Sequence, residues 1–297
     1  MNSSPLWLTL SPEPQRDSAT FSTQSQYSGE QTLVTATALC PHGPEIFTSQ
    51  PDGTLNLLLL DEKSSQLTPI IEFKAATNYQ QLSTFMLGGQ LHLLAYNSNE
   101  GLLDFYQVNA DHFQHQLGYK KTYGDTTDGF TTVRCLSYRD LSLVMAYNKT
   151  TGNSRLYELS VPPFKPLSVN MVWQSEWAKG WDNLSFFSLG GENFFFKMNP
   201  RYNAVNIDHY MDNPKEGSHP VGTGLPLSME TTLTETVHLP EGPGFIAYEA
   251  ASGKLSASRF HSDCLGWTEQ ASSTVHGGFS RALVIAGKNN NLVALLP

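Results

Sequence analysis

The chain has 297 residues, of which 39% are hydrophobic, and a formal net charge of -9 at pH 7. Its acidic and basic residues are scattered rather than blocked, which argues against nucleic acid or an anionic membrane as the main partner and favours a small or neutral ligand. Cys40, Cys135 and Cys264 are widely spaced and form neither a disulfide framework nor a zinc pattern. We interpret all three as buried thiols.

The first residues, "MNSSPLWLTLSPEPQ", lack the basic start and the long apolar run of a signal peptide. No segment approaches the roughly 18 apolar residues of a membrane span. We therefore expect a cytoplasmic protein. The chain also contains no nucleotide, metal or protease motif, so no cofactor is expected.

In chain order, two strands are predicted first, in "PLWLTLSP" and "ATFSTQSQY", and five similar units follow over residues 29 to 275. Each unit reads strand, tight turn, strand, tight turn, strand, with a looser fourth strand. One residue, which we call the landmark, closes the second apolar run of each unit and precedes turn chemistry such as "SNEG" or "KTTG". The landmarks are Gln50, Asn97, Asn148, Asn199 and Glu249, at intervals of 47, 51, 51 and 50 residues.

This repeat length is typical of propeller blades. The C-terminal "SRALVIAGKNNNLVALLP" supplies two more strands. Joined to the two N-terminal strands, they complete a sixth blade and leave no open edge. The prediction is one all-β domain over residues 1–297, a six-bladed β-propeller whose ring is closed by strands from both termini. Its blades span approximately 29–76, 77–124, 125–178, 179–229, 230–275, and 276–297 with 5–28. A seven-bladed ring or a pair of β-sandwiches remains an alternative.

Six blades of this length, with strands ending in Tyr-Asn, Tyr-Glu or Ser-Gln before a Gly turn, resemble the fungal fucose-specific lectins. The resemblance implies an Arg four residues before each landmark and a Glu four residues after each turn Gly or Asn, which together clamp the sugar. The first set of positions holds Ile46, Leu93, Val144, Phe195 and Phe245. The second holds Leu57, Phe105, Leu156, Ile207 and Ala257. Apolar side chains cannot pair with sugar hydroxyls, so we expect ordinary core at these positions.

A lectin-like propeller without these clamps is similar to the fungal hetero-Diels-Alderases of tropolone-sesquiterpenoid biosynthesis. That resemblance implies a cofactor-free pericyclase, which couples an o-quinone methide to a terpene alkene. Such an enzyme needs only to hold the two reactants face to face and to polarise one oxygen.

The innermost strands of a propeller border its channel, so we aligned them to find unusual residues. One column holds Thr37, Thr84, Arg134, Phe186, Thr236 and Leu283. The column two residues on holds Leu39, Met86, Leu136, Ser188, His238 and Ile285. Strand alternation places both columns on one face.

Arg134 and His238 are the ionisable residues in these columns, and we predict them as catalytic. The arginine would stabilise a developing oxyanion, and the histidine would move a proton. The substrate would contact Thr84, Met86, Phe186, Ser188 and Thr236. In the alternative interpretation, Arg134 pairs with a buried carboxylate and His238 belongs to the core.

Lys197 is a third catalytic candidate, because its column otherwise holds Thr and Ala. The alternative is an ion pair with Asp208. Trp173, Trp177 and Trp181 in "VWQSEWAKGW" predict a loop that either covers an apolar substrate or seals the junction between blades 3 and 4. A recurring tyrosine, at Tyr96, Tyr147 and Tyr248, is interpreted as packing.

The sequence thus predicts a cyclase that acts on a small apolar substrate, without nucleic acid or a membrane span, and it leaves a homo-oligomer open. The alternatives are a lectin with non-standard sites and a protein-interaction propeller that uses the loops at 160–180 and 211–227.

Overall fold

The computed structural model describes residues 6–12, 19–24, 33–40, 43–61, 66–75, 78–109, 112–120, 129–138, 140–162, 166–210, 213, 216–239, 241–275, 278–286 and 291–296. Twenty-four β-strands run through these residues, numbered β1 to β24. They form four-stranded antiparallel sheets, six in the described part of the chain, and each sheet has the strand composition of a propeller blade. The prediction of an all-β chain is confirmed.

The sheets belong to two compact units. The early unit comprises residues 30–180 and 212–217, and the late unit comprises residues 1–29, 181–211 and 218–297.

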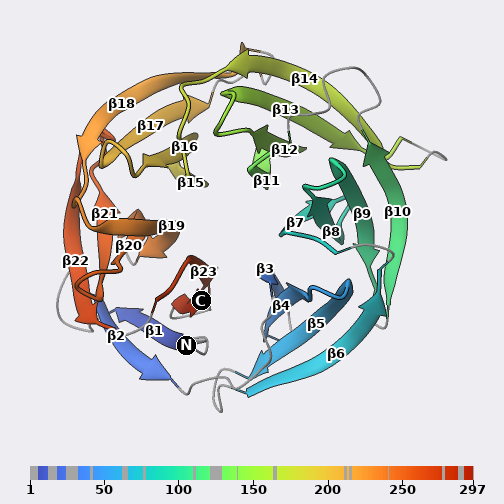
Figure 1. The fold of residues 1–297 in the computed structure, drawn as a ribbon, viewed down its shortest axis with the longest axis horizontal. Helices are drawn as coiled ribbons and strands as arrows, with labels where there is room; N and C mark the ends of the chain where they lie inside the picture. The colour runs from blue at the N-terminus through green and yellow to red at the C-terminus, as the bar shows by residue number, and fades with distance from the viewer. Residues whose placement is uncertain are drawn as a thin grey trace. The chain divides into compact units, whose positions relative to one another are not determined.

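Three sheets make up the early unit, and in each the strands lie in sequence order (Figure 1). The first sheet contains β3 (Leu33–Cys40), β4 (Gly43–Ser49), β5 (Thr54–Asp61) and β6 (Gln66–Lys74). The second contains β7 (Gln81–Leu87), β8 (Gln90–Asn97), β9 (Leu102–Val108) and β10 (Phe113–Lys120). The third contains β11 (Thr132–Tyr138), β12 (Leu141–Tyr147), β13 (Asn153–Ser160) and β14 (Ser168–Glu176).

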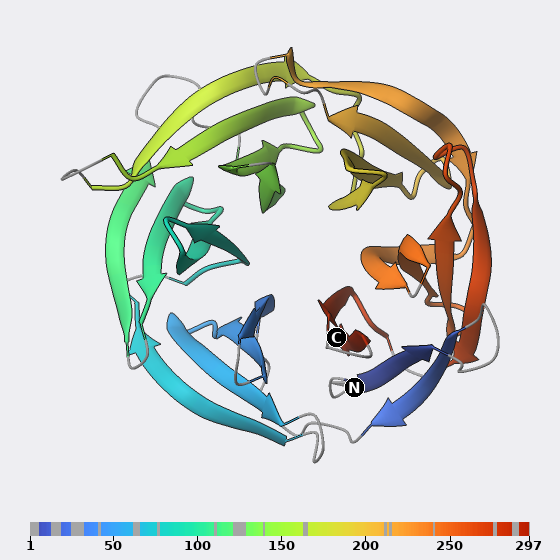
Figure 2. The ribbon, with the colours of Figure 1, turned by 180° about the vertical axis from the view of Figure 1, so that it is seen from behind.

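The late unit also has three sheets, which Figure 2 shows from behind. The first contains β15 (Asn183–Leu189), β16 (Glu192–Asn199), β17 (Ala204–Tyr210) and β18 (Ser218–Pro226). The second contains β19 (Thr231–Leu239), β20 (Gly242–Glu249), β21 (Lys254–Phe260) and β22 (Trp267–Thr274). The third, in the order β2-β1-β24-β23, joins β1 (Leu6–Pro12) and β2 (Ala19–Gln24) to β23 (Arg281–Ala286) and β24 (Asn291–Leu296). The predicted sharing of one sheet by strands from both ends of the chain is therefore confirmed.

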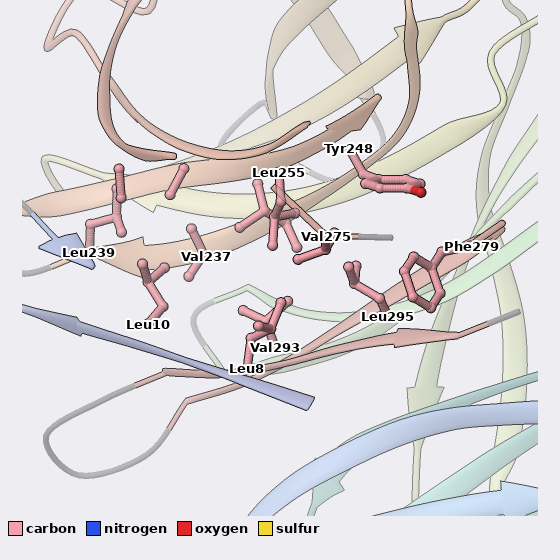
Figure 3. Packing of buried hydrophobic residues seen from close by; sticks show 13 residues of the cluster. Leu8, Leu10, Val237, Leu239, Tyr248, Leu255, Val275, Phe279, Val293 and Leu295 are labelled. Atoms are coloured by element: carbon pink, nitrogen blue, oxygen red, sulfur yellow. The ribbon is translucent and has the colours of Figure 1, made fainter. Parts of the chain in front are cut away.

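The middle sheet of each unit, β7–β10 in the early unit and β19–β22 in the late unit, buries both of its faces against neighbouring sheets. In the early unit, one face of β7–β10 packs against the first sheet through Leu93 and Phe47, and the other packs against the third through Phe105 and Val144. In the late unit, Leu8 and Leu295 pack against Val237 and Leu255 of the second sheet (Figure 3). Two buried faces explain why the second and third strands are almost continuously apolar instead of alternating.

The landmark asparagines organise the turns that follow them. The Oδ1 atom of Asn97 accepts hydrogen bonds from the backbone amides two and three residues on, at 3.0 and 3.2 Å. Asn148 repeats the arrangement at 2.8 and 2.9 Å, and its Nδ2 donates to the carbonyl oxygen of Gly129 at 2.8 Å. These are Asx turns, in which a side chain replaces a backbone acceptor. The repeated motif that dominates the sequence is therefore scaffold.

Side chains on the first strand of one sheet form hydrogen bonds with the exposed backbone edge of the first strand of the next sheet. Gln81 on β7 accepts from the backbone N–H of Val133 at 2.7 Å and donates to the carbonyl oxygen of Thr131 at 2.8 Å. Ser83 accepts from the N–H of Cys135 at 2.9 Å. An unpaired strand edge would otherwise leave these groups without partners or open to another chain. The side-chain amide of Gln81 thus forms the hydrogen bonds that the backbone of another strand would form at this edge.

Candidate functional site

Four of the first strands carry an exposed side chain at an equivalent register position. In the early unit these residues are Met86 on β7 and Ser137 on β11, and in the late unit they are Ser188 on β15 and His238 on β19. Each pairs with the residue six positions before its landmark, so the alignment follows from the hairpin register. We call these four residues the exposed row. Its members differ in chemistry from sheet to sheet.

The sequence alignment of the first strands was wrong for Arg134. Thr84 pairs with the residue four positions before its landmark, and so do Phe186 and Thr236. In β11 that position belongs to Cys135, because Cys135 pairs with Val144, whereas Arg134 pairs with Met145. A slip of one residue moves a side chain to the other face of the sheet. Arg134 is half-buried on the face opposite to Cys135 and Ser137, so it does not belong to the exposed row.

A similar slip affects the C-terminal hairpin. Val284 pairs with Val293, and Val293 pairs with Leu8. Val293 and Leu8 both belong to the buried cluster that packs against the preceding sheet. Val284 therefore occupies the strand position that the sequence alignment assigned to Leu283. The side chains of Thr37, Leu39, Leu283 and Ile285 lie outside the described part of the structure.

His238 remains the ionisable side chain of the exposed row. Its imidazole is exposed near the end of β19, and among the described residues no side chain forms a hydrogen bond with it. Its backbone is fixed, because its carbonyl oxygen accepts a 2.6 Å hydrogen bond from Nδ2 of Asn291. A positioned imidazole with an unengaged ring can exchange protons with a bound molecule.

The polar neighbours of His238 are engaged in the scaffold. Thr236, two residues earlier on the same face, is half-buried and donates to the carbonyl oxygen of Phe186 at 3.0 Å. The hydroxyl of Ser188 donates to Oδ1 of Asn193. Phe186 stacks edge-on against Phe195 at a centroid distance of 5.0 Å. Of the predicted substrate contacts in the late unit, Ser188 is therefore exposed, while Phe186 and Thr236 are half-buried.

Thr84 and Met86 were the predicted contacts in the early unit. Met86 is 52% exposed, which is unusual for a methionine, whereas Thr84 is half-buried. An exposed thioether on a first strand is a flexible apolar contact for a ligand.

Lys197 forms a buried ion pair, so the alternative interpretation of this residue is confirmed. Its Nζ atom lies 2.6 Å from Oδ2 of Asp208, and both side chains are almost inaccessible to solvent. The indole ring of Trp181 lies 5.1 Å from the same nitrogen. Burial lowers the pKa of Lys197, and the nearby Asp208 carboxylate opposes this shift. A lysine enclosed in this way does not reach a substrate.

The three tryptophans do not form one loop. Trp173 lies on β14, the fourth strand of its sheet, and its ring packs against Trp177 at 6.0 Å. Gly217 lies against the same indole: a Cβ atom built on it would be 2.4 Å from Nε1. Trp181 belongs to the late unit, where it is buried over Lys197. The strand extends through Trp173 because β14 pairs with β13, a long-range contact that the local sequence does not reveal.

The recurring tyrosines are structural. Tyr96 accepts a 2.7 Å hydrogen bond from the N–H of Phe130, and Tyr147 donates to the carbonyl oxygen of Ala178 at 2.7 Å. Tyr248 packs edge-on against Phe279. Each tyrosine therefore contacts the segment that leads into the next sheet, and all three are almost fully buried.

All ten positions that would form lectin clamps are buried, which confirms that they belong to the core. No residue among them is more than 3% exposed. The fucose-lectin mode of sugar binding is therefore ruled out at these positions.

Of the two cysteines whose side chains the structure describes, Cys264 is buried as predicted and Cys135 is half-buried. Burial raises the pKa of Cys264 to about 11. Desolvation raises the pKa of Cys135 to about 12. The side chain of Cys40 lies outside the described part.

Sequence reasoning missed a buried polar network in the early unit. Asp104 accepts a 2.7 Å hydrogen bond from the hydroxyl of Tyr79 and lies 3.0 Å from Nε2 of His115. Tyr106 extends the network, with its hydroxyl 2.7 Å from that of Tyr79. Gly118 leaves room for it, because a Cβ atom there would lie 3.0 Å from Oδ1 of Asp104. The one available signal was the charge of Asp104 in the otherwise apolar "LLDFY".

In the part of the chain that the structure describes, no group of three or more His, Cys, Asp or Glu side chains gathers in a way that could hold a metal ion. Nor does that part contain a helix long and apolar enough to cross a membrane.

Comparisons with known proteins identify the fold of the chain but assign it to no family. No protein-family profile and no curated protein matches the chain. Among solved structures, a protein of Lactobacillus plantarum is similar with a TM-score of 0.58 and 11% identity, over 94% of this chain and 84% of that one. A 6-phosphogluconolactonase-like protein of Bacteroides fragilis gives a TM-score of 0.56 and 11% identity, over 95% and 85%.

The periplasmic gluconolactonase of Pseudomonas aeruginosa gives a TM-score of 0.53 and 10% identity, over 92% and 97%. These likenesses carry no support for the lectin or Diels-Alderase resemblance. They show that this chain has the all-β propeller fold.

Proposed function

We propose that the chain is a cofactor-free cyclase that couples an o-quinone methide, derived from a tropolone or phenol, to a terpene alkene. The main observation that supports this proposal is the exposed row on the first strands, with His238 as its ionisable member. The burial of all ten lectin-clamp positions excludes these positions as the place where a ligand binds. In the late unit, the substrate would lie over Ser188 and His238 at the ends of β15 and β19.

The reaction needs no redox partner. The precursor is a hydroxymethyl phenol or hydroxymethyl tropolone, which loses the ring hydroxyl proton and its benzylic hydroxide as one molecule of water. His238 accepts the ring proton and delivers it to the departing oxygen. The resulting quinone methide then adds across the alkene, so that one C–C and one C–O bond form together. Holding the two partners in register supplies most of the acceleration.

We also propose that the six sheets close into a single six-bladed ring. The pairing of β1 with β24 and the contacts between neighbouring first strands within each unit support this closure.

The decisive experiment incubates the purified protein with a hydroxymethyl tropolone or hydroxymethyl phenol and a humulene-type alkene. Chiral product analysis against a protein-free control is expected to show faster formation of one stereoisomer. Equal rates and a racemic product with and without protein would refute the cyclase.

The His238→Gln variant tests the assigned residue. It is expected to lower turnover at least about 100-fold, within the usual range for a general acid–base group. His261→Gln is the matched control, because His261 is also exposed in the late unit and its Nε2 atom lies 3.0 Å from the hydroxyl oxygen of Thr268. Equal turnover in the two variants would remove His238 from the mechanism.

Two other functions are tested in the same preparation. Specific binding on a glycan array, reversed by free sugar, would favour a lectin. Hydrolysis of gluconolactone would favour the activity named for one of the structural neighbours.

A further inference from the structure

Two histidines lie opposite each other on the last two strands of the first late sheet. His209 on β17 and His219 on β18 are direct cross-strand partners. Their ring centroids are 5.1 Å apart, and the ring planes meet at 75°. Phe194 lies 5.2 Å from the ring of His209 and restricts its rotation.

A carboxylate orients the first of these rings. Oε2 of Glu192 lies 2.9 Å from Nε2 of His209, so in the neutral imidazole this nitrogen carries the proton. The lone pair then resides on Nδ1. This is the arrangement by which proteins prepare a histidine as a metal ligand, with the outer nitrogen bound to a carboxylate.

The spacing of the rings agrees with a shared cation. Two imidazole nitrogens that each lie about 2.1 Å from one tetrahedral Zn²⁺ place their ring centroids about 5 Å apart. The observed centroid distance of 5.1 Å matches this spacing. The rings are also reachable, since His219 is exposed and the side chain of His209 is 21% accessible.

We propose that His209 and His219 form a binding site for a borderline transition-metal cation such as Zn²⁺, with Glu192 orienting His209. The pair does not enclose the ion, because the described residues contain no group of three or more His, Cys, Asp or Glu side chains that could hold a metal ion together. The remaining coordination positions belong to water or to the donor atoms of a second ligand. Structural zinc sites have four protein ligands and catalytic ones have three, so a two-histidine site leaves more of the coordination sphere open than either.

The site is separate from the proposed cyclase residues, and its cation is not part of the cyclase reaction. Binding of Zn²⁺ is measured directly by isothermal titration calorimetry, on protein first stripped with a chelator. We expect one equivalent of Zn²⁺ to bind the wild-type protein and to raise its melting temperature, while Mg²⁺ leaves that temperature unchanged.

Variants assign the binding to the pair. His219→Gln is expected to abolish the bound equivalent, and Glu192→Gln to weaken it about tenfold, as removal of an orienting carboxylate commonly does. His261→Gln changes an exposed histidine outside the pair, and this variant should bind Zn²⁺ as the wild type does. The melting temperature of each variant without metal checks that it is folded.

Two results would overturn the proposal. One is a wild-type protein that binds no Zn²⁺. The other is a His219→Gln variant that is folded and binds Zn²⁺ with unchanged affinity.

Discussion

The Nζ atom of Lys197 and the Oδ2 atom of Asp208 lie 2.6 Å apart in the interior of the first late sheet, where neither side chain has more than 6% of its surface exposed. Removal of one partner leaves an uncompensated buried charge. We expect Lys197→Met to lower the free energy of unfolding by about 3 to 5 kcal/mol.

The double variant Lys197→Met with Asp208→Leu should regain most of that loss, because two apolar side chains carry no desolvation cost. Urea unfolding of the two variants measures both changes. A single variant as stable as the wild type would show that the pair is not needed for stability.

The Tyr79–Tyr106 pair makes the protein sensitive to alkali. Burial raises the pKa of both hydroxyls, that of Tyr106 to about 12. Since the folded state holds these protons more tightly than the unfolded state, the stability they confer is complete below pH 10 and falls as the pH rises above it. Each tyrosine should contribute a loss of about 1.4 kcal/mol per pH unit between its unfolded and folded pKa values.

Unfolding in urea at pH 8, 10 and 11 measures this slope. Tyr106→Phe should reduce it, whereas Tyr202→Phe should not, because Tyr202 is 65% exposed. Identical slopes in wild type and Tyr106→Phe would contradict the assignment.

Tyr147 secures the segment that follows its sheet. Loss of its hydroxyl in Tyr147→Phe leaves the carbonyl oxygen of Ala178 without this donor, so we expect a loss of about 1 kcal/mol. Thermal unfolding checks the value, with Tyr202→Phe as the unaffected control. No difference between the two variants would mean that water replaces the hydroxyl at no cost.

Gln81 is expected to contribute to the stability of the folded protein although its side chain is partly exposed. Gln81→Leu removes two hydrogen bonds to the edge of β11 and is expected to cost about 1 to 3 kcal/mol. Faster hydrogen exchange at the amide of Val133 is the specific readout. Unchanged exchange there would show that the edge is protected by other groups.

The repeat was readable from the sequence because it depends on local chemistry. The landmarks Asn97 and Asn148 are Asx-turn residues, and apolar runs flank them because both sheet faces are buried. The strand order, the turns and the sheet shared by both chain ends followed from this pattern alone.

The candidate site was harder to predict, because it depends on register. One residue of error placed Arg134 on the face of Thr84, although hairpin pairing gives that face to Cys135. Trp173 seemed to belong to a loop because the strand partner that extends β14 lies earlier in the chain, on β13. The network around Asp104 joins Tyr79, which precedes its sheet, to a residue of β10, and no spacing rule connects them.

The pairing of Leu8 with Val293 has a consequence for biosynthesis. A ribosome releases β1 long before β24, so the N-terminal hairpin must wait with an unsatisfied edge while five sheets are made. Closing such a long loop carries a large entropy cost, which makes this sheet the expected last step of folding. A nascent or truncated chain that lacks β24 would expose the unpaired edge of β1, where another chain could pair and aggregate. Pairing of β24 with β1 would remove this edge and complete the sheet.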